Sequence, residues 1–198
     1  MEDYLKDQFQ KKMFSEKRYH HSRNVAKAAL QLAEKYGEDQ DRAYLAGLVH
    51  DICKEMDASQ QYALMMAGNF KPDFAEMNSR KLWHGIAGAY FLQTRFDIQD
   101  MEILNAVRFH TVGRAGMSLL EEIIYIADMI SEEREYKGVD KMRRLAQKNL
   151  QSAMLEALRD AIASVMKKEG LVPVYTIEAY NYYTNQLKNT HQERGLGV

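Results

Sequence analysis

The chain has 198 residues, of which 46% are hydrophobic, with 27 basic residues, 28 acidic residues and one cysteine. This length suits a single domain built around one core, and the lone Cys53 excludes a disulfide framework within the chain. The nearly neutral charge balance provides no global field for nucleic acid or an anionic membrane, so we expect neither as a partner.

The N-terminal residues, from Met1 to Asp7, lack the basic and apolar segments of a signal peptide. No apolar run approaches the ~18 residues that a transmembrane helix needs. From these two features we expect a cytoplasmic protein.

Apolar residues recur at helical spacing along the chain, strand-like alternation is scarce, and the only prolines are Pro72 and Pro173. We therefore predict an all-α fold. A first helix should begin at or near Ser15 and end at Gly37, where a left-handed cap is available. Its apolar stripe consists of Val25, Ala28, Ala29, Leu32, Ala33 and Tyr36.

Later helices carry their own start and stop signals. A helix capped by Asp39 is predicted to run to about Lys54. Ser118 and Glu121 have the spacing of a capping box ahead of the apolar run that bears Asp128. The stretch from about residue 140 to 168 predicts one or two bundle helices that end at Gly170, and a last helix should begin near Thr176.

His50 and Asp51 stand side by side in the apolar run 45–53, where an uncompensated imidazole and carboxylate are costly to bury. Four more residues of the same chemistry lie in helix-like settings: His21, His84, His110 and Asp128. One such residue alone is usually structural and hydrogen-bonded to the backbone. Four imidazoles and two carboxylates together are enough to bind one or two divalent metal ions. Without a thiolate, the set suits iron, manganese, cobalt or zinc rather than a closed structural zinc site.

Five blocks occur in order along the chain: RYHHS at 18–22, AGLVHDICK at 46–54, HG at 84–85, HTVG at 110–113 and YIAD at 125–128. Their histidines and aspartates resemble the pattern of the HD-domain superfamily of metal-dependent phosphohydrolases. Together the blocks look like its YqeK-type subfamily, the symmetrical bis(5'-nucleosyl)-tetraphosphatases, over nearly the whole chain from about Phe14. Within the first block, alignment on Arg18 and Ser22 favours His21 over His20 as the ligand.

The resemblance implies one HD domain over residues 1–198: a helical bundle with its core at about 14–135, C-terminal helices packed on it, and the metal site between core helices. It implies that Asp51 bridges two divalent ions, with iron favoured. One ion would be held by His21, His50, Asp51 and Asp128, and the second by Asp51, His84 and His110. Two ions so placed can activate water for in-line attack on a phosphoryl group.

Basic residues near these blocks are candidates for phosphate contact: Lys54, Arg108, Arg114 and Arg134. Lys54 is the strongest of them and joins His50 and Asp51 as a predicted catalytic residue, and Arg134 comes second. The competing interpretation of each is a solvated helix charge.

Two further features are predicted to bind substrate. The turn with Thr111 and Gly113 can let the backbone approach a phosphate, because glycine has no Cβ. Trp83 is the aromatic residue expected to stack on a nucleobase, with a place in the core as its alternative.

The sequence therefore predicts a metal-dependent hydrolase that cleaves diadenosine tetraphosphate symmetrically into two molecules of ADP. The metal chemistry follows from the residues, and the nucleotide substrate follows from the resemblance. A homodimer would be unsurprising. Two alternatives stay open. One is the same site acting on a nucleoside triphosphate, a deoxynucleotide monophosphate or a cyclic nucleotide, and the other is a non-catalytic metal or nucleotide sensor, which should have lost ligands.

Overall fold

The computed structural model describes the backbone of residues 15–195 and the side chains of residues 15–189. Every regular element in this part of the chain is a helix, as predicted. In chain order the helices are α2 (Glu16–Tyr36), α3 (Gln40–Val49), α4 (Ala58–Ala67), α5 (Phe74–Met77), α6 (Arg80–Arg95), α7 (Met101–Phe109), α8 (Leu119–Ile130), α9 (Val139–Lys148), α10 (Leu150–Lys167) and α11 (Val174–Gly195). None of these helices is long and apolar enough to cross a lipid bilayer.

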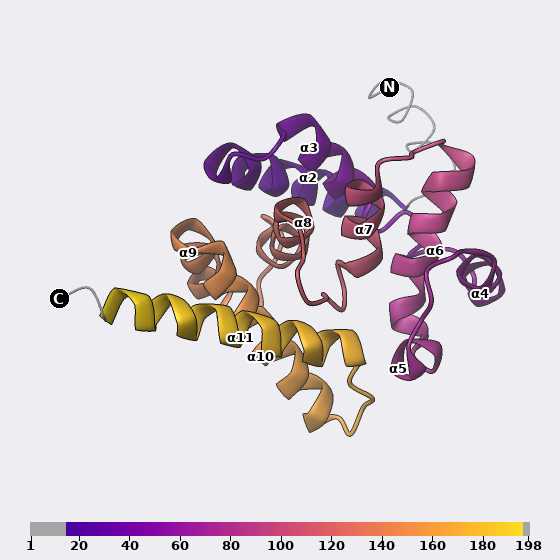
Figure 1. Ribbon diagram of the computed structural model, residues 1–198. Helices are drawn as coiled ribbons and strands as arrows, with labels where there is room; N and C mark the ends of the chain where they lie inside the picture. Colours follow the sequence, from indigo (N-terminus) through magenta and orange to yellow (C-terminus); the bar gives the residue numbers. More distant parts are fainter. Residues whose placement is uncertain (1–14, 196–198) are drawn as a thin grey trace.

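Helix α8 lies at the centre of the bundle (Figure 1). It packs against α2, α3, α7, α9 and α10, and its residues from Leu120 to Ala127 are all buried. Around it, α2 packs on α3, α6 packs on α4 and α7, and α11 packs on α10. This arrangement brings the N-terminal helices and the loops after α3 and α7 to one end of α8.

Local signals set several helix ends where the sequence predicts them. Ser15 caps α2 by accepting a hydrogen bond from a backbone N–H of the first turn, and Gly37 ends α2 with a φ of 79°. Asp39 caps α3 in the same way, and Ser118 and Glu121 form the capping box of α8. These predicted ends are confirmed because each signal acts within one helical turn.

Helix α3 ends at Val49, so the prediction that it runs to about Lys54 is wrong. His50 is its C-cap, and beyond it the backbone forms turns, such as the hydrogen bond from Lys54 N–H to Asp51 O (2.8 Å). The side-chain amide of Gln61 donates to backbone carbonyls of this segment, at distances of 2.9 and 3.0 Å, in place of helical partners. His50 and Asp51 therefore stand on the turn that follows α3.

Glycine allows a close approach between α2 and α3. A Cβ atom on Gly47 would lie only 2.8 Å from the Cα atom of Ala26, so a larger residue would push the two helices apart. Because α3 packs closely on α2 at this point, the turn with His50 and Asp51 lies beside α2, the helix that carries His21.

The C-terminal helices form where the sequence predicts them. The stretch from 140 to 168 forms two helices, α9 and α10, because Asn149 is extended (φ −159°) and its side chain caps α10. Helix α11 begins at Val174, close to the predicted Thr176, and the N–H of Val174 donates to Asp73 Oδ2 at 2.6 Å. A residue 101 positions earlier in the chain thus bonds to the first turn of this helix.

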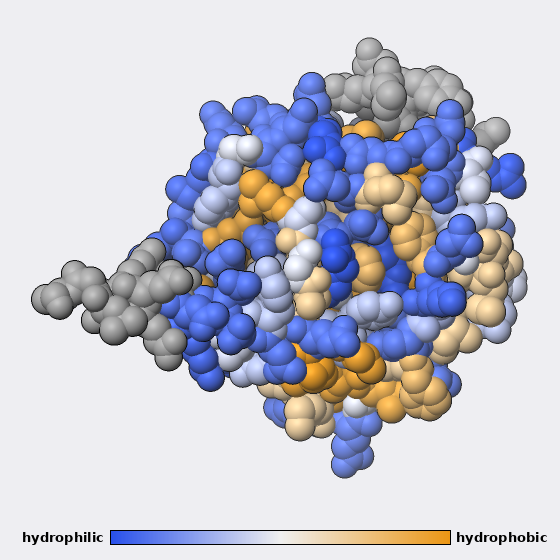
Figure 2. Space-filling view, viewed as in Figure 1, coloured by the Kyte–Doolittle hydropathy of each residue, from blue (hydrophilic) through white to orange (hydrophobic). Residues whose placement is uncertain are grey.

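The surface in Figure 2 is mostly polar, with apolar side chains gathered at its lower edge over the α10–α11 connection. Exposed apolar residues of this region are Met166, Leu171, Val174 and Ile177. Phe74 of α5 is 74% exposed and follows Asp73, which bonds to the start of α11. Apolar side chains therefore reach the surface on α5, near the end of α10 and at the start of α11, and elsewhere at Tyr62, Met66, Met101 and Tyr136.

Candidate metal centre

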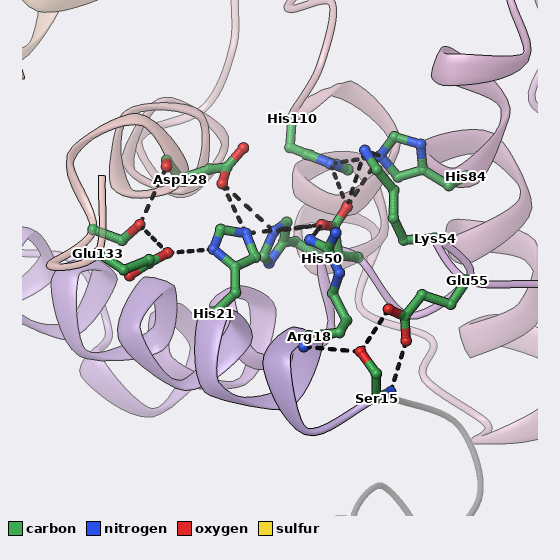
Figure 3. A network of polar contacts seen from close by, with 12 residues as sticks. Ser15, Arg18, His21, His50, Lys54, Glu55, His84, His110, Asp128 and Glu133 are labelled. Atoms are coloured by element: carbon green, nitrogen blue, oxygen red, sulfur yellow. Dashed lines mark hydrogen bonds and ion pairs between the residues drawn. The ribbon is translucent and has the colours of Figure 1, made fainter. Parts of the chain in front are cut away.

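The six predicted ligand side chains come together from five segments of the chain (Figure 3). His21 lies on α2, His84 on α6 and Asp128 on α8, and the others follow the ends of α3 and α7: His50, Asp51 and His110. All are buried except Asp128, whose side chain is 22% exposed. The fold thus assembles the whole predicted set in one place.

Asp51 lies between two pairs of histidines and presents a different oxygen to each. Its Oδ1 atom is 3.1 Å from His84 Nε2 and 3.4 Å from His110 Nε2. Its Oδ2 atom is 3.5 Å from His50 Nε2 and 3.8 Å from His21 Nε2. The structure therefore contains two groups of potential ligands that share one carboxylate.

Asp128 belongs to the group that contains His21 and His50. Its Oδ1 atom is 3.1 Å from His21 Nε2 and 3.9 Å from His50 Nε2. This placement matches the ligand division that the family resemblance implies. His20, by contrast, is exposed, with Nδ1 3.4 Å from Asn24 Nδ2, so the structure places His21 and not His20 in the cluster.

The donor atoms of the cluster fit a divalent metal ion. His21 Nε2, His50 Nε2 and Asp51 Oδ1 are buried without a hydrogen-bond partner, a costly arrangement unless a cation is bound. The opposite nitrogens of His50 and His110 donate to the backbone carbonyls of Gly47 and Val107, both at 2.7 Å. These bonds leave the Nε2 lone pairs directed at the cluster, as metal coordination requires.

Burial and neighbouring charge set the protonation of the cluster. Burial lowers the pKa of His84 to about 4 and also lowers the pKa of His110, so both imidazoles are neutral at pH 7. Burial opposes ionisation of Asp51, but His50 and His110 outweigh it and hold the pKa of Asp51 well below its usual range. Burial likewise opposes the charge on His50, yet the carboxylate of Asp51 raises the pKa of His50. Ionised carboxylates and neutral imidazoles are the forms that bind metal.

Glu133 is a member of the site that the sequence analysis missed. Its carboxylate accepts a hydrogen bond from His21 Nδ1, and it is itself fixed by Asn24 Nδ2 and Ser131 Oγ, both at 2.8 Å. A carboxylate behind a ligand histidine orients the ring and raises its basicity. No signal in the sequence marks this role, because Glu133 lies in a run of acidic and basic residues after α8.

Three cationic side chains contact the cluster. Lys54 Nζ is 3.0 Å from His84 Nε2 and 3.7 Å from Asp51 Oδ1. Arg134 pairs with the Asp128 carboxylate and also donates to the Asp128 backbone carbonyl at 2.8 Å. Arg18, which lies in the first sequence block but was not predicted as a site residue, pairs with Asp51. Burial lowers the pKa of Lys54 from its ordinary value.

Two predicted phosphate-binding candidates have structural partners instead. Arg108 is buried in a two-pronged ion pair with Glu76 at 2.6 and 2.8 Å, and Arg114 pairs with Glu121 at 2.7 and 3.0 Å. Both guanidinium groups also face the ring of Phe109. Both positive charges are thus paired with carboxylates within the fold.

The remaining residues that are predicted to bind substrate lie in different surroundings. Gly113 has a positive φ of 67° and packs against α10 and α11, where a Cβ would meet Leu158 Cδ2 at 3.3 Å; its approach to a phosphate stays a prediction. Trp83 donates its indole N–H to Glu76 O (2.9 Å) and packs on Tyr62, and it makes no contact with the cluster among the described residues. Thr111, in contrast, lines a hollow that also includes His110 and Asp128.

Known proteins resemble this chain in sequence and in fold. Residues 18–133 match the HD domain family. The chain is 36% identical to "Bis(5'-nucleosyl)-tetraphosphatase, symmetrical" of Bacillus subtilis (strain 168), over 87% of this chain and 92% of that protein. It is also 36% identical to the protein of the same name from Halalkalibacterium halodurans, over 88% of this chain and 92% of the relative.

A solved structure extends the similarity to the fold. It is the crystal structure of a predicted HD superfamily hydrolase involved in NAD metabolism from Clostridium acetobutylicum. The two chains superpose with a TM-score of 0.85 and 39% sequence identity, covering 93% of this chain and 95% of the other.

Proposed function

The chain belongs to the HD-domain family, and from this premise we propose that it is a metal-dependent hydrolase that cleaves diadenosine tetraphosphate symmetrically into two molecules of ADP. The relatives from Bacillus subtilis and Halalkalibacterium halodurans, which match along most of their length, are named as symmetrical bis(5'-nucleosyl)-tetraphosphatases. The observation that carries the proposal is the convergence of all six ligand-type side chains, with one oxygen of Asp51 directed at each histidine pair.

We propose that the site holds two divalent ions. His21, His50, Asp51 and Asp128 would bind one, and Asp51, His84 and His110 would bind the other. Iron is favoured by the family resemblance, and the nitrogen and oxygen donors also suit manganese, cobalt or zinc. Such ions supply an activated water and positive charge for attack on a phosphoanhydride.

Basic side chains around the ligands would bind the phosphate chain. Lys54, Arg134 and Arg18 reach the cluster from three different segments, so a polyphosphate laid across it meets positive charge on several sides. The charge-assisted contacts would orient the scissile anhydride over the site. A full ligand set disfavours the alternative of a non-catalytic sensor.

Product analysis tests the proposal. Protein purified without oxygen, with its metal content measured, is incubated with diadenosine tetraphosphate, a nucleoside triphosphate, a deoxynucleotide monophosphate and a cyclic nucleotide. We expect ADP as the only nucleotide product of the tetraphosphate and slower turnover of the others, with no hydrolysis by chelator-treated protein. ATP and AMP in equal amounts, or preference for another nucleotide, would contradict symmetrical cleavage of the tetraphosphate.

A further inference from the structure

The described residues form hollows that border the ligand cluster, and two of these differ in their linings. The first, of about 790 Å³, includes His21 and is otherwise lined by polar and charged side chains such as Lys17, Arg18 and Arg134. The second, of about 540 Å³, includes His110 and Asp128 and has a partly apolar lining. Both volumes fall in the range of small-molecule pockets.

The lining of the second hollow suits a nucleoside. Its lining includes the ring of Tyr136, the small α10 residues Ala157 and Ala161, and the polar Asp160 and Ser164. Tyr136 is 39% exposed, and among the described residues no ring packs on it and no side chain bonds its hydroxyl. An aromatic face left open in this way can stack on a nucleobase.

The turn that carries Tyr136 is fixed before any ligand binds. Arg143 of α9 donates to the backbone carbonyls of Ile130 (3.1 Å), Ser131 (3.0 Å) and Arg134 (3.1 Å). Arg134 in turn holds the backbone of Asp128. Tyr136 therefore has a set position relative to the ligand cluster, which lowers the entropic cost of binding.

We propose that the second hollow is a nucleoside subsite, in which one adenine of the substrate stacks on Tyr136; this inference rests on the proposed function. The cluster borders both hollows, so a substrate that extends from one into the other has its central anhydride at the ligands. Each half of the substrate then carries one nucleoside and two phosphates, as symmetrical cleavage requires. Tyr136 takes the role that the sequence assigns to Trp83.

Binding of ADP and pyrophosphate to metal-loaded protein tests the subsite, because pyrophosphate carries the phosphates of ADP without the nucleoside. By calorimetry, Tyr136→Ala should weaken ADP binding about tenfold or more and leave pyrophosphate binding unchanged. Tyr136→Phe keeps the ring and should bind ADP as the unaltered protein does. For diadenosine tetraphosphate, KM should rise in Tyr136→Ala more than kcat falls.

Phe74→Ala is the matched control, since it removes a ring that is 74% exposed on α5, and it should change neither affinity. Unchanged ADP affinity in Tyr136→Ala, or an equal loss for ADP and pyrophosphate, would overturn the subsite. If the selective loss of ADP binding is seen but the unaltered protein does not cleave the tetraphosphate, the subsite is supported and the proposed reaction is refuted.

Discussion

At the scale of single residues, Asp51 is the side chain on which both halves of the proposed centre depend, because each of its oxygens faces one histidine pair. Asp51→Ala should therefore lose both ions and all hydrolysis. His84→Ala removes a ligand from one group only and should retain about one ion per chain. Metal analysis of the two purified variants compares these stoichiometries. Equal metal content in both would refute a shared carboxylate.

Glu133 acts on the site through His21, whose Nδ1–H donates a hydrogen bond to the Glu133 carboxylate. Glu133→Gln keeps the size of the side chain but removes its charge, and we expect metal affinity to fall about 10- to 100-fold. Competition with a chromophoric chelator measures this affinity directly. Glu132→Gln is the control, because Glu132 is an exposed neighbour, and it should retain the affinity of the unaltered protein. Similar losses in both variants would point to a general effect of surface charge.

Lys54 and Arg134 are expected to bind phosphate groups of the substrate without being metal ligands. Lys54→Ala and Arg134→Ala should keep their metal but lose charge-assisted contacts worth roughly 1.5 to 3 kcal/mol each, about tenfold or more in kcat/KM. The loss should be larger for diadenosine tetraphosphate than for a small chromogenic phosphodiester, which has fewer oxygens to bind. Arg159→Ala, at an exposed pair with Glu156, serves as the control. Equal losses on both substrates would show that the phosphate chain is bound elsewhere.

At the scale of elements, α8 and α11 meet at a buried carboxyl group. Tyr183 of α11 donates to Glu122 of α8 at 2.7 Å, and burial raises the pKa of Glu122 from 4.5 to about 7. Between these two pH values the unfolded chain releases the Glu122 proton while the folded chain keeps it. The free energy of unfolding should therefore fall as pH rises through this interval, by about 3 kcal/mol in total, and level off above pH 7.

Glu122→Gln tests this pH dependence, because glutamine can still accept the hydrogen bond from Tyr183 but does not ionise. In urea unfolding, the variant should match the unaltered protein near pH 5 and exceed it near pH 8 by about 3 kcal/mol. Tyr183→Phe should retain the pH dependence, since Glu122 still titrates. A constant difference between Glu122→Gln and the unaltered protein at all pH values would show that Glu122 has an ordinary pKa.

At the scale of the whole molecule, the proposed ions would join α2, α6, α8 and the turns after α3 and α7. Metal that binds only the folded chain stabilises it by about 4 kcal/mol at a free concentration 1,000 times Kd. Removing the metal with a chelator should thus lower Tm by roughly 10 °C. Calorimetric scans with and without chelator measure the shift, and Asp51→Ala should show none. A chelator-independent Tm would indicate that the helices do not depend on metal.

The sequence by itself determined the helical class, several helix ends and the identity of the six ligand-type residues. These features follow from local physics, because a cap such as Ser15 or Gly37 acts within a few residues. Residues such as His50 and Asp51 follow from residue type, since a histidine or carboxylate in an apolar run needs a partner, whereas the choice of His21 over His20 follows from the family resemblance. Arg18 and Lys54 lie in the same sequence blocks, although only Lys54 was recognised.

Only the tertiary structure decided how these residues are used. The backbone after α3 is bonded by the side chain of Gln61 instead of by helical partners, so the early end of α3 could not be predicted from neighbouring residues. Glu133 meets His21 across 112 residues of sequence, and Arg108 meets Glu76 across 32. The reason is physical, because these features depend on contacts between distant segments that only the packed bundle brings together. Such contacts decide which charges pair, which aromatic rings stay exposed and which carboxylate oxygen faces which histidine.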